Sequence, residues 1–123
     1  MKYLFFILSI LLGSCQTQKS NTGTAEACFG FDQRQCDVDD FAAFIQSNSQ
    51  EDLFSGISTY LSNQNIDIQH IRIDMDFHEN VCEACEICPK HHRFFVSIPN
   101  GDVPKLEALQ LFNLVSVSCA DYF

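Results

Sequence analysis

Apolar residues recur at helical spacing in two stretches of the chain, residues 37–45 and 53–61. The shared faces consist of Val38, Phe41, Phe44 and Ile45 in the first stretch and Leu53, Phe54, Ile57, Tyr60 and Leu61 in the second. Such stripes are typical of amphipathic helices that pack one side against a core. Asp37 and Ser49 precede the stripes, and both residue types cap helix N-termini. The pattern therefore predicts two short helices.

Farther along the chain the apolar period changes to two. The residues from His70 to His78 alternate strictly, with Ile71, Ile73, Met75 and Phe77 on one face. Phe94, Val96 and Ile98 alternate in the same way. These stretches predict two half-buried strands of an antiparallel hairpin. A third helical stripe follows Asp102 and consists of Leu106, Leu109 and Phe112; a last strand is expected at 114–120.

The order of these elements predicts an α+β fold with two N-terminal helices followed by β-β-α-β. Helices should pack on one face of a small sheet. A strand, a crossover helix and a further strand in one sheet normally run parallel. We therefore expect the strand at 114–120 to run parallel to the strand at 94–98.

The N-terminal residues indicate export. Lys2 is followed by an apolar run at 3–12, which is too short to span a bilayer and is typical of a signal peptide. The run ends in Leu12-Gly13-Ser14-Cys15, which resembles the lipobox of bacterial lipoproteins. The resemblance covers residues 1–15 and implies that residues 1–14 are removed and that Cys15 carries the lipid. An ordinary secretory signal is the alternative.

This resemblance implies a membrane-anchored protein of the bacterial cell envelope, facing the periplasm or the exterior. Residues 15–27 are polar and without apolar periodicity, and they are expected to form a lipidated tether. Residues 28–123 are expected to form a single domain. Within it, the stretch from Cys28 to Cys36 is predicted to be a short loop.

The charge of the chain limits its partners. Seven basic residues face sixteen acidic ones, and removal of residues 1–14 leaves a formal charge of −10. Such a field repels phosphate backbones and anionic headgroups, so we expect no nucleic-acid partner and no polybasic contact with lipid. Attachment to the membrane is expected through the lipid alone, and the acidity favours cationic partners.

Six cysteines remain after Cys15 is set aside: Cys28, Cys36, Cys82, Cys85, Cys88 and Cys119. Exported proteins meet an oxidising environment, so these residues are candidates for disulfides that staple the fold. Six cysteines allow 15 connectivities. The parallel direction expected for the last strand carries Cys119 away from the loop between the hairpin strands. It is therefore expected to bond to Cys28 or Cys36.

The densest group of chemistry-bearing residues is 81–93, VCEACEICPKHHR. We expect its cysteines to be structural and the protein to be a binding or interaction module with no cofactor and no enzymatic activity. A first alternative is a zinc or copper site formed by Cys82, Cys85 and Cys88 with His78, His91 or His92. A second alternative is thiol–disulfide exchange by a C-x2-C pair.

Overall fold

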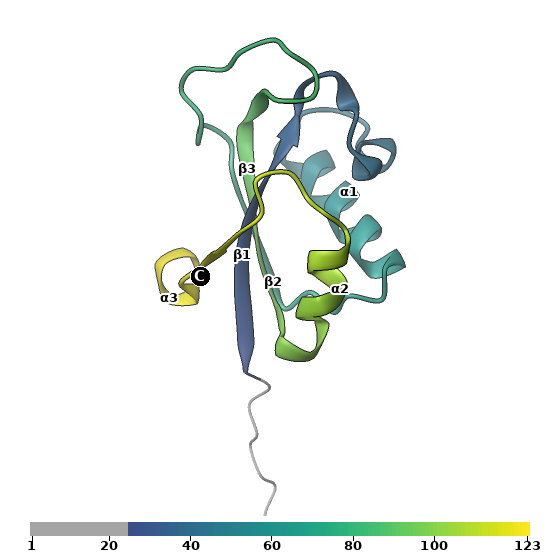
Figure 1. The fold of residues 1–123 in the computed structure, drawn as a ribbon, viewed down its shortest axis with the longest axis vertical. Coiled ribbons are helices and arrows are strands. Elements are labelled where there is room, and N and C mark those ends of the chain that lie inside the picture. The colour runs from purple at the N-terminus through teal and green to yellow at the C-terminus, as the bar shows by residue number, and fades with distance from the viewer. Residues whose placement is uncertain (1–24) are drawn as a thin grey trace, which may run out of the picture.

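The computed structural model describes residues 25–123 and shows a four-stranded antiparallel sheet in the order β2-β3-β1-β4 (Figure 1). The strands are β1 (Glu26–Arg34), β2 (His70–Asp74), β3 (Pro89–Pro99) and β4 (Val115–Val117). The helices are α1 (Gln50–Asn63), α2 (Val103–Ala108) and α3 (Cys119–Tyr122), with 3-10 turns η1 (Gln35–Asp37), η2 (Asp40–Phe44) and η3 (Asn100–Asp102). The predicted α+β class is confirmed. The signal peptide, Cys15 and the tether up to residue 24 lie outside the described residues.

The strand β1 was not predicted, and it is central to the sheet. It pairs antiparallel with β3, from Glu26 opposite Pro99 to Asp32 opposite Arg93. The predicted loop from Cys28 to Cys36 is therefore wrong, and the sheet begins at the last two residues assigned to the tether. All side chains from residue 28 to 33 are buried, on both faces of the sheet. Because polar and apolar residues do not alternate there, the usual signature of a half-buried strand is missing.

The second predicted helix is confirmed as α1. Ser49 caps it by accepting a hydrogen bond from the backbone N–H of Asp52 at 3.2 Å. The first predicted helix is wrong in type, since only the short turn η2 forms there. Gly56 explains how close the two lie, because a Cβ at this position would come within 2.5 Å of Ile45 Cγ1. Phe54, predicted to share the buried stripe, is 49% exposed.

The predicted hairpin is formed by β2 and β3, from His70 opposite Ser97 to Asp74 opposite Arg93. The strand β2 ends at Asp74, four residues earlier than predicted. Beyond Asp74 the side chains no longer alternate between the two faces of a strand. Phe77 was expected on the same face as Ile73, but its ring packs edge-on against Phe95. Residues 75–88 form a long loop at one end of the sheet (Figure 1).

The last strand runs as predicted. Since β3 and β4 are both antiparallel to β1, they point in the same direction, with β1 lying between them. The strand is shorter than expected, because it stops at Val117 and α3 begins at Cys119. Cys119 is bonded to Cys28, one of its two expected partners.

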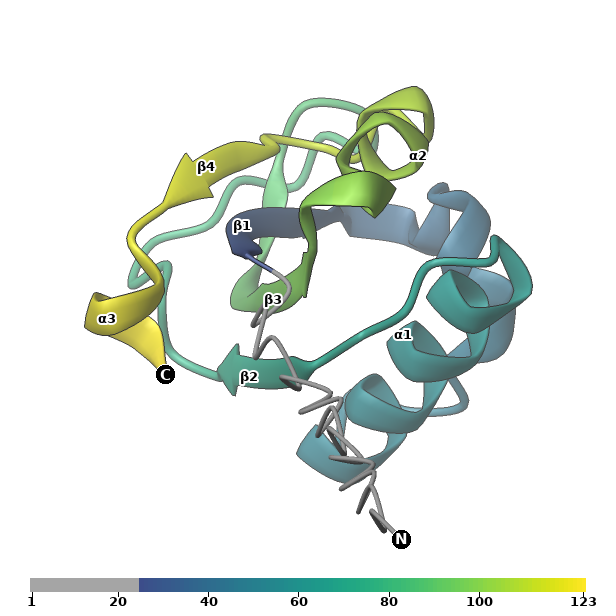
Figure 2. The ribbon, with the colours of Figure 1, turned by 90° about the horizontal axis from the view of Figure 1, so that it is seen from below.

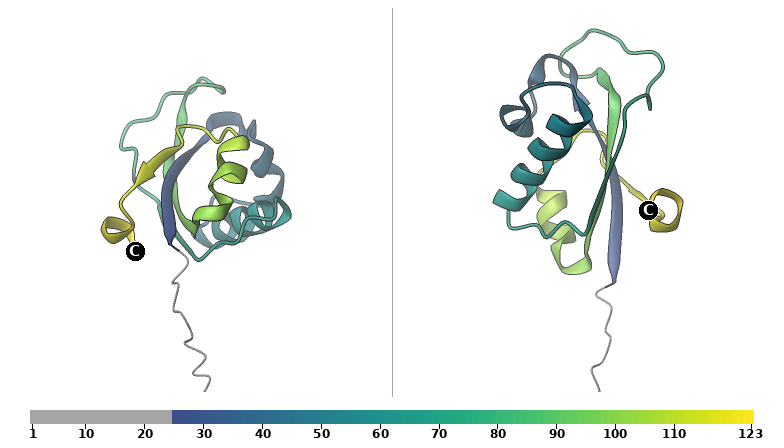
Figure 3. Two further views of the ribbon diagram at one scale, coloured as in Figure 1. Left: turned by 60° about the horizontal axis from the view of Figure 1, so that its bottom comes forward. Right: turned by 180° about the vertical axis from the view of Figure 1, so that it is seen from behind.

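The two faces of the sheet are covered differently. α1 and α2 lie on one face, as predicted, and the short α3 lies on the opposite face (Figures 2 and 3). The first face carries the apolar core, which includes Phe29, Phe31, Leu53, Ile57, Leu61, Phe94, Val96, Ile98 and Leu106. On the opposite face Phe95 stacks on Tyr122 of α3, with ring centroids 4.1 Å apart. The helix α3 was not predicted, since its first residues had been assigned to the last strand.

Candidate functional site

The six cysteines of the described domain form three disulfides. The pairs are Cys28–Cys119, Cys36–Cys85 and Cys82–Cys88. The first ties α3 to β1 across 91 residues of sequence, and the second joins η1 to the loop 75–88. The third closes a small ring within that loop. Long closures such as the first two constrain the unfolded chain most strongly.

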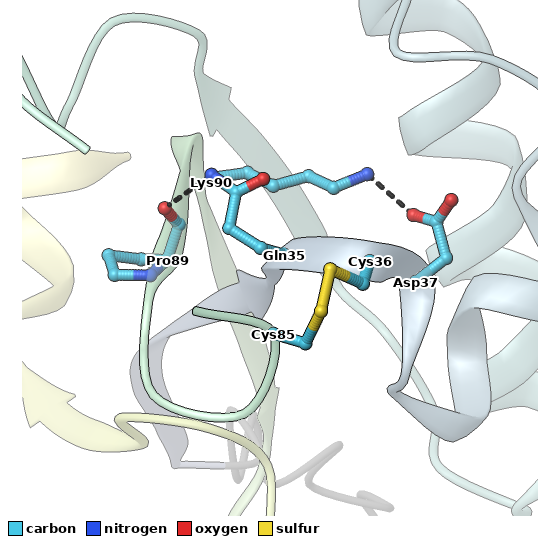
Figure 4. The surroundings of a disulfide bond; sticks show 6 residues. All are labelled: Gln35, Cys36, Asp37, Cys85, Pro89 and Lys90. Carbon is cyan, nitrogen blue, oxygen red and sulfur yellow. Dashed lines mark hydrogen bonds and ion pairs between the residues drawn. A yellow bond between two sulfur atoms is a disulfide. The ribbon is translucent and has the colours of Figure 1, made fainter. Parts of the chain in front are cut away.

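The 3-10 turn η1, which follows β1, contacts the loop and the start of β3 at more points than the disulfide alone. Figure 4 shows Gln35, beside Cys36, with its side-chain amide donating to the carbonyl of Pro89 at 3.0 Å. The backbone N–H of Gln35 donates to the carbonyl of Cys88 at 2.9 Å. Lys90 forms an ion pair with Asp37, the residue that follows Cys36 in the chain (Figure 4). The loop is therefore fixed to the sheet by both covalent and polar contacts.

This arrangement bears on the two alternative chemistries. The sulfurs of Cys82, Cys85 and Cys88 are all in disulfides, so none is a thiolate available to a metal in this state. Within residues 25–123, no group of three or more histidine, cysteine, aspartate and glutamate side chains is placed to hold a metal ion. Neither C-x2-C pair is bonded to itself, since Cys85 takes a partner outside the loop.

Each of the three candidate histidines forms a hydrogen bond with a different part of the domain. His78 Nε2 donates to the Asp32 carboxylate at 2.9 Å, and His91 Nδ1 donates to the carbonyl of His78 at 2.7 Å. His92 is buried, and its Nε2 donates to the side-chain carbonyl of Gln33 at 2.8 Å. Burial lowers the pKa of His92 to about 4, so its ring is neutral at pH 7. Each ring thus has an internal role.

A buried polar network lies on the face of the sheet that α3 covers. Asp32 is fully buried and accepts hydrogen bonds at 2.9 Å from Arg93, His78 and the side-chain amide of Asn113. The guanidinium of Arg93 also lies 5.0 Å from the ring centroid of Phe77. Because every member has a partner, this network reads as a structural ion pair rather than an open site.

An open cavity of about 230 Å³ lies on the other side of the molecule, next to η2. Its walls come from the end of β1, from η2, from α1 and from the segment after α2, and they consist of Arg34, Val38, Asp39, Asp40, Phe41, Tyr60, Leu109, Gln110 and Leu111. A second hollow shares Arg34 and Val38 with it and reaches Glu86 and Ile87 of the cysteine loop. The two hollows adjoin at Arg34 and Val38 and are together called the Arg34 groove here.

The linear pattern does not single out the residues of this groove. Tyr60 and Phe41 belong to apolar stripes, and Asp39 and Asp40 fall in the stretch 37–45 that was predicted to be a helix. Only β1, which was not predicted, brings Arg34 beside them. No signal in the linear pattern distinguishes such residues from ordinary core and surface positions. Comparisons with protein families, with curated proteins and with solved structures found no match for this chain.

Proposed function

We propose that this protein is an exported, lipid-anchored protein of the bacterial cell envelope that works as a binding module. The observation that carries the proposal is that all six cysteines of the domain are consumed in disulfides. Disulfides persist outside the reducing cytosol, which agrees with an extracellular or periplasmic location. The loop 75–88 is then part of a rigid frame held by the disulfides, and its sulfurs take no part in a reaction.

The frame supports binding rather than catalysis. His78, His91 and His92 each have one ring nitrogen bonded within the domain, and both carboxylate oxygens of the buried Asp32 accept hydrogen bonds. The Arg34 groove, by contrast, contains polar groups that face solvent. Among residues 25–123, no helix combines the length and the apolar character needed to cross a bilayer. Anchoring is accordingly assigned to the lipid on Cys15, as the lipobox resemblance implies.

The anchor is tested by fractionating cells that produce the wild type or Cys15→Ser. We expect the wild type in the membrane fraction and the variant in the soluble envelope fraction or unprocessed. A Ser14→Ala variant keeps a small residue before the cysteine and serves as the control. Full membrane partitioning of Cys15→Ser would overturn the anchor.

The role of the cysteines is tested by intact mass spectrometry after alkylation, with and without reductant. We expect no alkylation at the six cysteines of the domain before reduction and six additions after it. Three thiols that appear only on chelation, together with one zinc or copper per chain, would establish the metal site instead. Turnover in a disulfide-reduction assay that is lost in Cys82→Ser would establish thiol–disulfide exchange.

A further inference from the structure

The Arg34 groove contains polar groups that have hydrogen-bond partners within the domain and others that have none. Arg34 belongs to the first kind. Its Nε donates to the carbonyl of Glu86 at 3.0 Å and its Nη1 to Asp39 at 2.8 Å. Its guanidinium also lies 4.4 Å from the ring centroid of Phe112. The positive charge of Arg34 is therefore directed mainly at groups of the protein itself.

Asp39 is equally engaged. One carboxylate oxygen accepts from Arg34 Nη1, and the other accepts from the backbone N–H of Arg34 at 2.6 Å. Its side chain is only 4% exposed. Asp39 and Arg34 thus form a neutral pair, which leaves the cavity with one uncompensated negative charge, that of Asp40.

Two polar groups remain open to the cavity. Asp40 is exposed, and within the described part of the chain its carboxylate forms no ion pair. Tyr60 is only 5% exposed, yet its hydroxyl has no hydrogen-bond partner among residues 25–123. Since no side-chain polar atom there is both fully buried and unpaired, this hydroxyl must reach solvent through the cavity that it lines.

The electrostatics of the hydroxyl agree with this placement. Burial raises the pKa of Tyr60 above its usual range, and the nearby carboxylates of Asp40 and Asp39 raise it further. The hydroxyl is therefore neutral at physiological pH, and its oxygen can accept a hydrogen bond. A carboxylate and a neutral hydroxyl facing one cavity are two acceptors for a single cationic donor.

From this geometry we infer that the Arg34 groove binds a lysine or arginine side chain presented by a basic segment of a protein partner. The ammonium or guanidinium group donates to Asp40 and to the Tyr60 hydroxyl. The aliphatic stem lies along Val38, which is 48% exposed, in the way that long cationic side chains cover apolar surface. The inference rests on the proposed function, because it names the partner chemistry of that binding module.

The size and the surroundings of the cavity favour a peptide over a larger small molecule. At about 230 Å³ it is smaller than the pockets of roughly 300–1,000 Å³ that hold drug-sized ligands, and it suits one side chain. The adjoining hollow extends the groove past Ile87, whose side chain is 74% exposed. This gives the residues flanking the cation an apolar contact. The strongly acidic chain attracts a basic partner over a longer range.

The test is calorimetric titration of the full chain, as purified from cells, with the peptide acetyl-Leu-Gly-Lys-Gly-Leu-amide. Saturable binding that weakens with salt is expected. A peptide with norleucine in place of lysine keeps the stem and loses the charge, so it should bind at least tenfold more weakly. Equal binding of the two peptides would overturn the inference. Binding of 1-butylammonium as tight as that of the lysine peptide would show a small amine as the ligand and would overturn the protein partner.

Variants locate the site. Asp40→Asn should weaken lysine-peptide binding at least tenfold, and Tyr60→Phe should weaken it about threefold while keeping the buried ring. Asp121→Asn on α3 removes the same charge far from the groove and should leave affinity within twofold. Equal losses in Asp40→Asn and Asp121→Asn would reduce the effect to net charge and would overturn the site.

The outcome is separable from that of the proposed function. If the lysine peptide fails to bind while Cys15 anchors the protein and all six cysteines remain oxidised, only the ligand assignment fails. If the anchor or the disulfides fail while the peptide still binds at Asp40, the groove stands and the envelope proposal falls.

Discussion

The two faces of the sheet are built from different chemistry. On the face covered by α1 and α2, Phe31 stacks on Phe94 with ring centroids 5.1 Å apart, amid aliphatic side chains. On the face covered by α3, the cross-strand pair next to it is Asp32 and Arg93, a buried ion pair. Two neighbouring cross-strand pairs of β1 and β3 are therefore an aromatic stack on one face and a charge pair on the other.

The two faces should therefore tolerate substitutions differently. An apolar core needs the right volume, and many residues supply it. A buried charge network needs every member, because one missing partner leaves an uncompensated charge in a low dielectric. Gly30 belongs to the second case, since a Cβ there would lie 3.0 Å from Arg93 Nε and 3.0 Å from Phe95. A larger residue at this position would require the side chains of Arg93 and Phe95 to shift.

The largest effect is expected from Asp32→Ala. The variant leaves the Arg93 guanidinium buried without its carboxylate and should lower the free energy of unfolding by about 3 to 5 kcal/mol. Urea denaturation measures the loss. The double variant Asp32→Leu with Arg93→Met removes both charges and should recover most of the stability. If the double variant stays unstable, the two side chains contribute more to stability than the neutralisation of each other's charge.

The Cys28–Cys119 bond should come next, because it holds α3 on the charged face. Replacing both cysteines with alanine should cost roughly 2 to 4 kcal/mol, since the bond closes a long segment of chain. Hydrogen exchange should show α3 released, with Phe95 losing its stack on Tyr122. The matched control is the Cys82–Cys88 pair, which spans six residues and should cost clearly less. Equal losses in the two variants would contradict the chain-entropy argument.

Acid should weaken the helix face through His92, which packs edge-on against Phe94. Its folded pKa is about 4 and its unfolded value near 6.5, so the unfolded chain binds a proton in this interval and the folded one does not. Its contribution is complete above about pH 6.5 and declines as the pH falls towards 4. The ring lines a hollow that is open to solvent, which reduces the effect of burial, so we expect a loss of about 1 to 2 kcal/mol.

The His92 contribution is measured from unfolding free energies at several pH values, together with an NMR titration of the ring. In His92→Phe this part of the pH dependence should disappear, while the contribution of the acidic side chains stays. A ring that titrates near 6.5 in the folded protein would contradict its burial as neutral imidazole.

The smallest effect is expected from a volume-conserving change on the helix face. Leu53 is fully buried in α1, and Leu53→Met should cost about 1 kcal/mol, because the flexible thioether fills the same space. Thermal unfolding should show one cooperative transition, slightly lowered. A loss as large as that of Asp32→Ala would show that the apolar face is as intolerant as the charged one, and the contrast between the faces would not hold.

The sequence by itself determined α1 and β2, whose apolar residues recur or alternate because one face meets the core and the other is more exposed. It also determined β3 from the alternation of Phe94, Val96 and Ile98, although the expected half-buried strand is in fact buried on both faces from residue 92 to 98. The direction of β4 also followed, since a strand that comes after a crossover helix in one sheet normally runs parallel to the strand before it. That direction limits the partner of Cys119 to Cys28 or Cys36, and the bond is to Cys28.

Only the tertiary structure decided what β1 does. Its residues from Cys28 to Gln33 are buried on both faces, so local periodicity could not reveal a strand. Without β1, nothing joined Asp32 to Arg93 and His78, or brought Arg34 beside Asp39 and Tyr60. These groups lie 26 to 61 residues apart in sequence, apart from the Arg34–Asp39 pair, and their meeting depends on long-range pairing. Pairing of that kind is a property of the folded sheet, which the order of residues does not display.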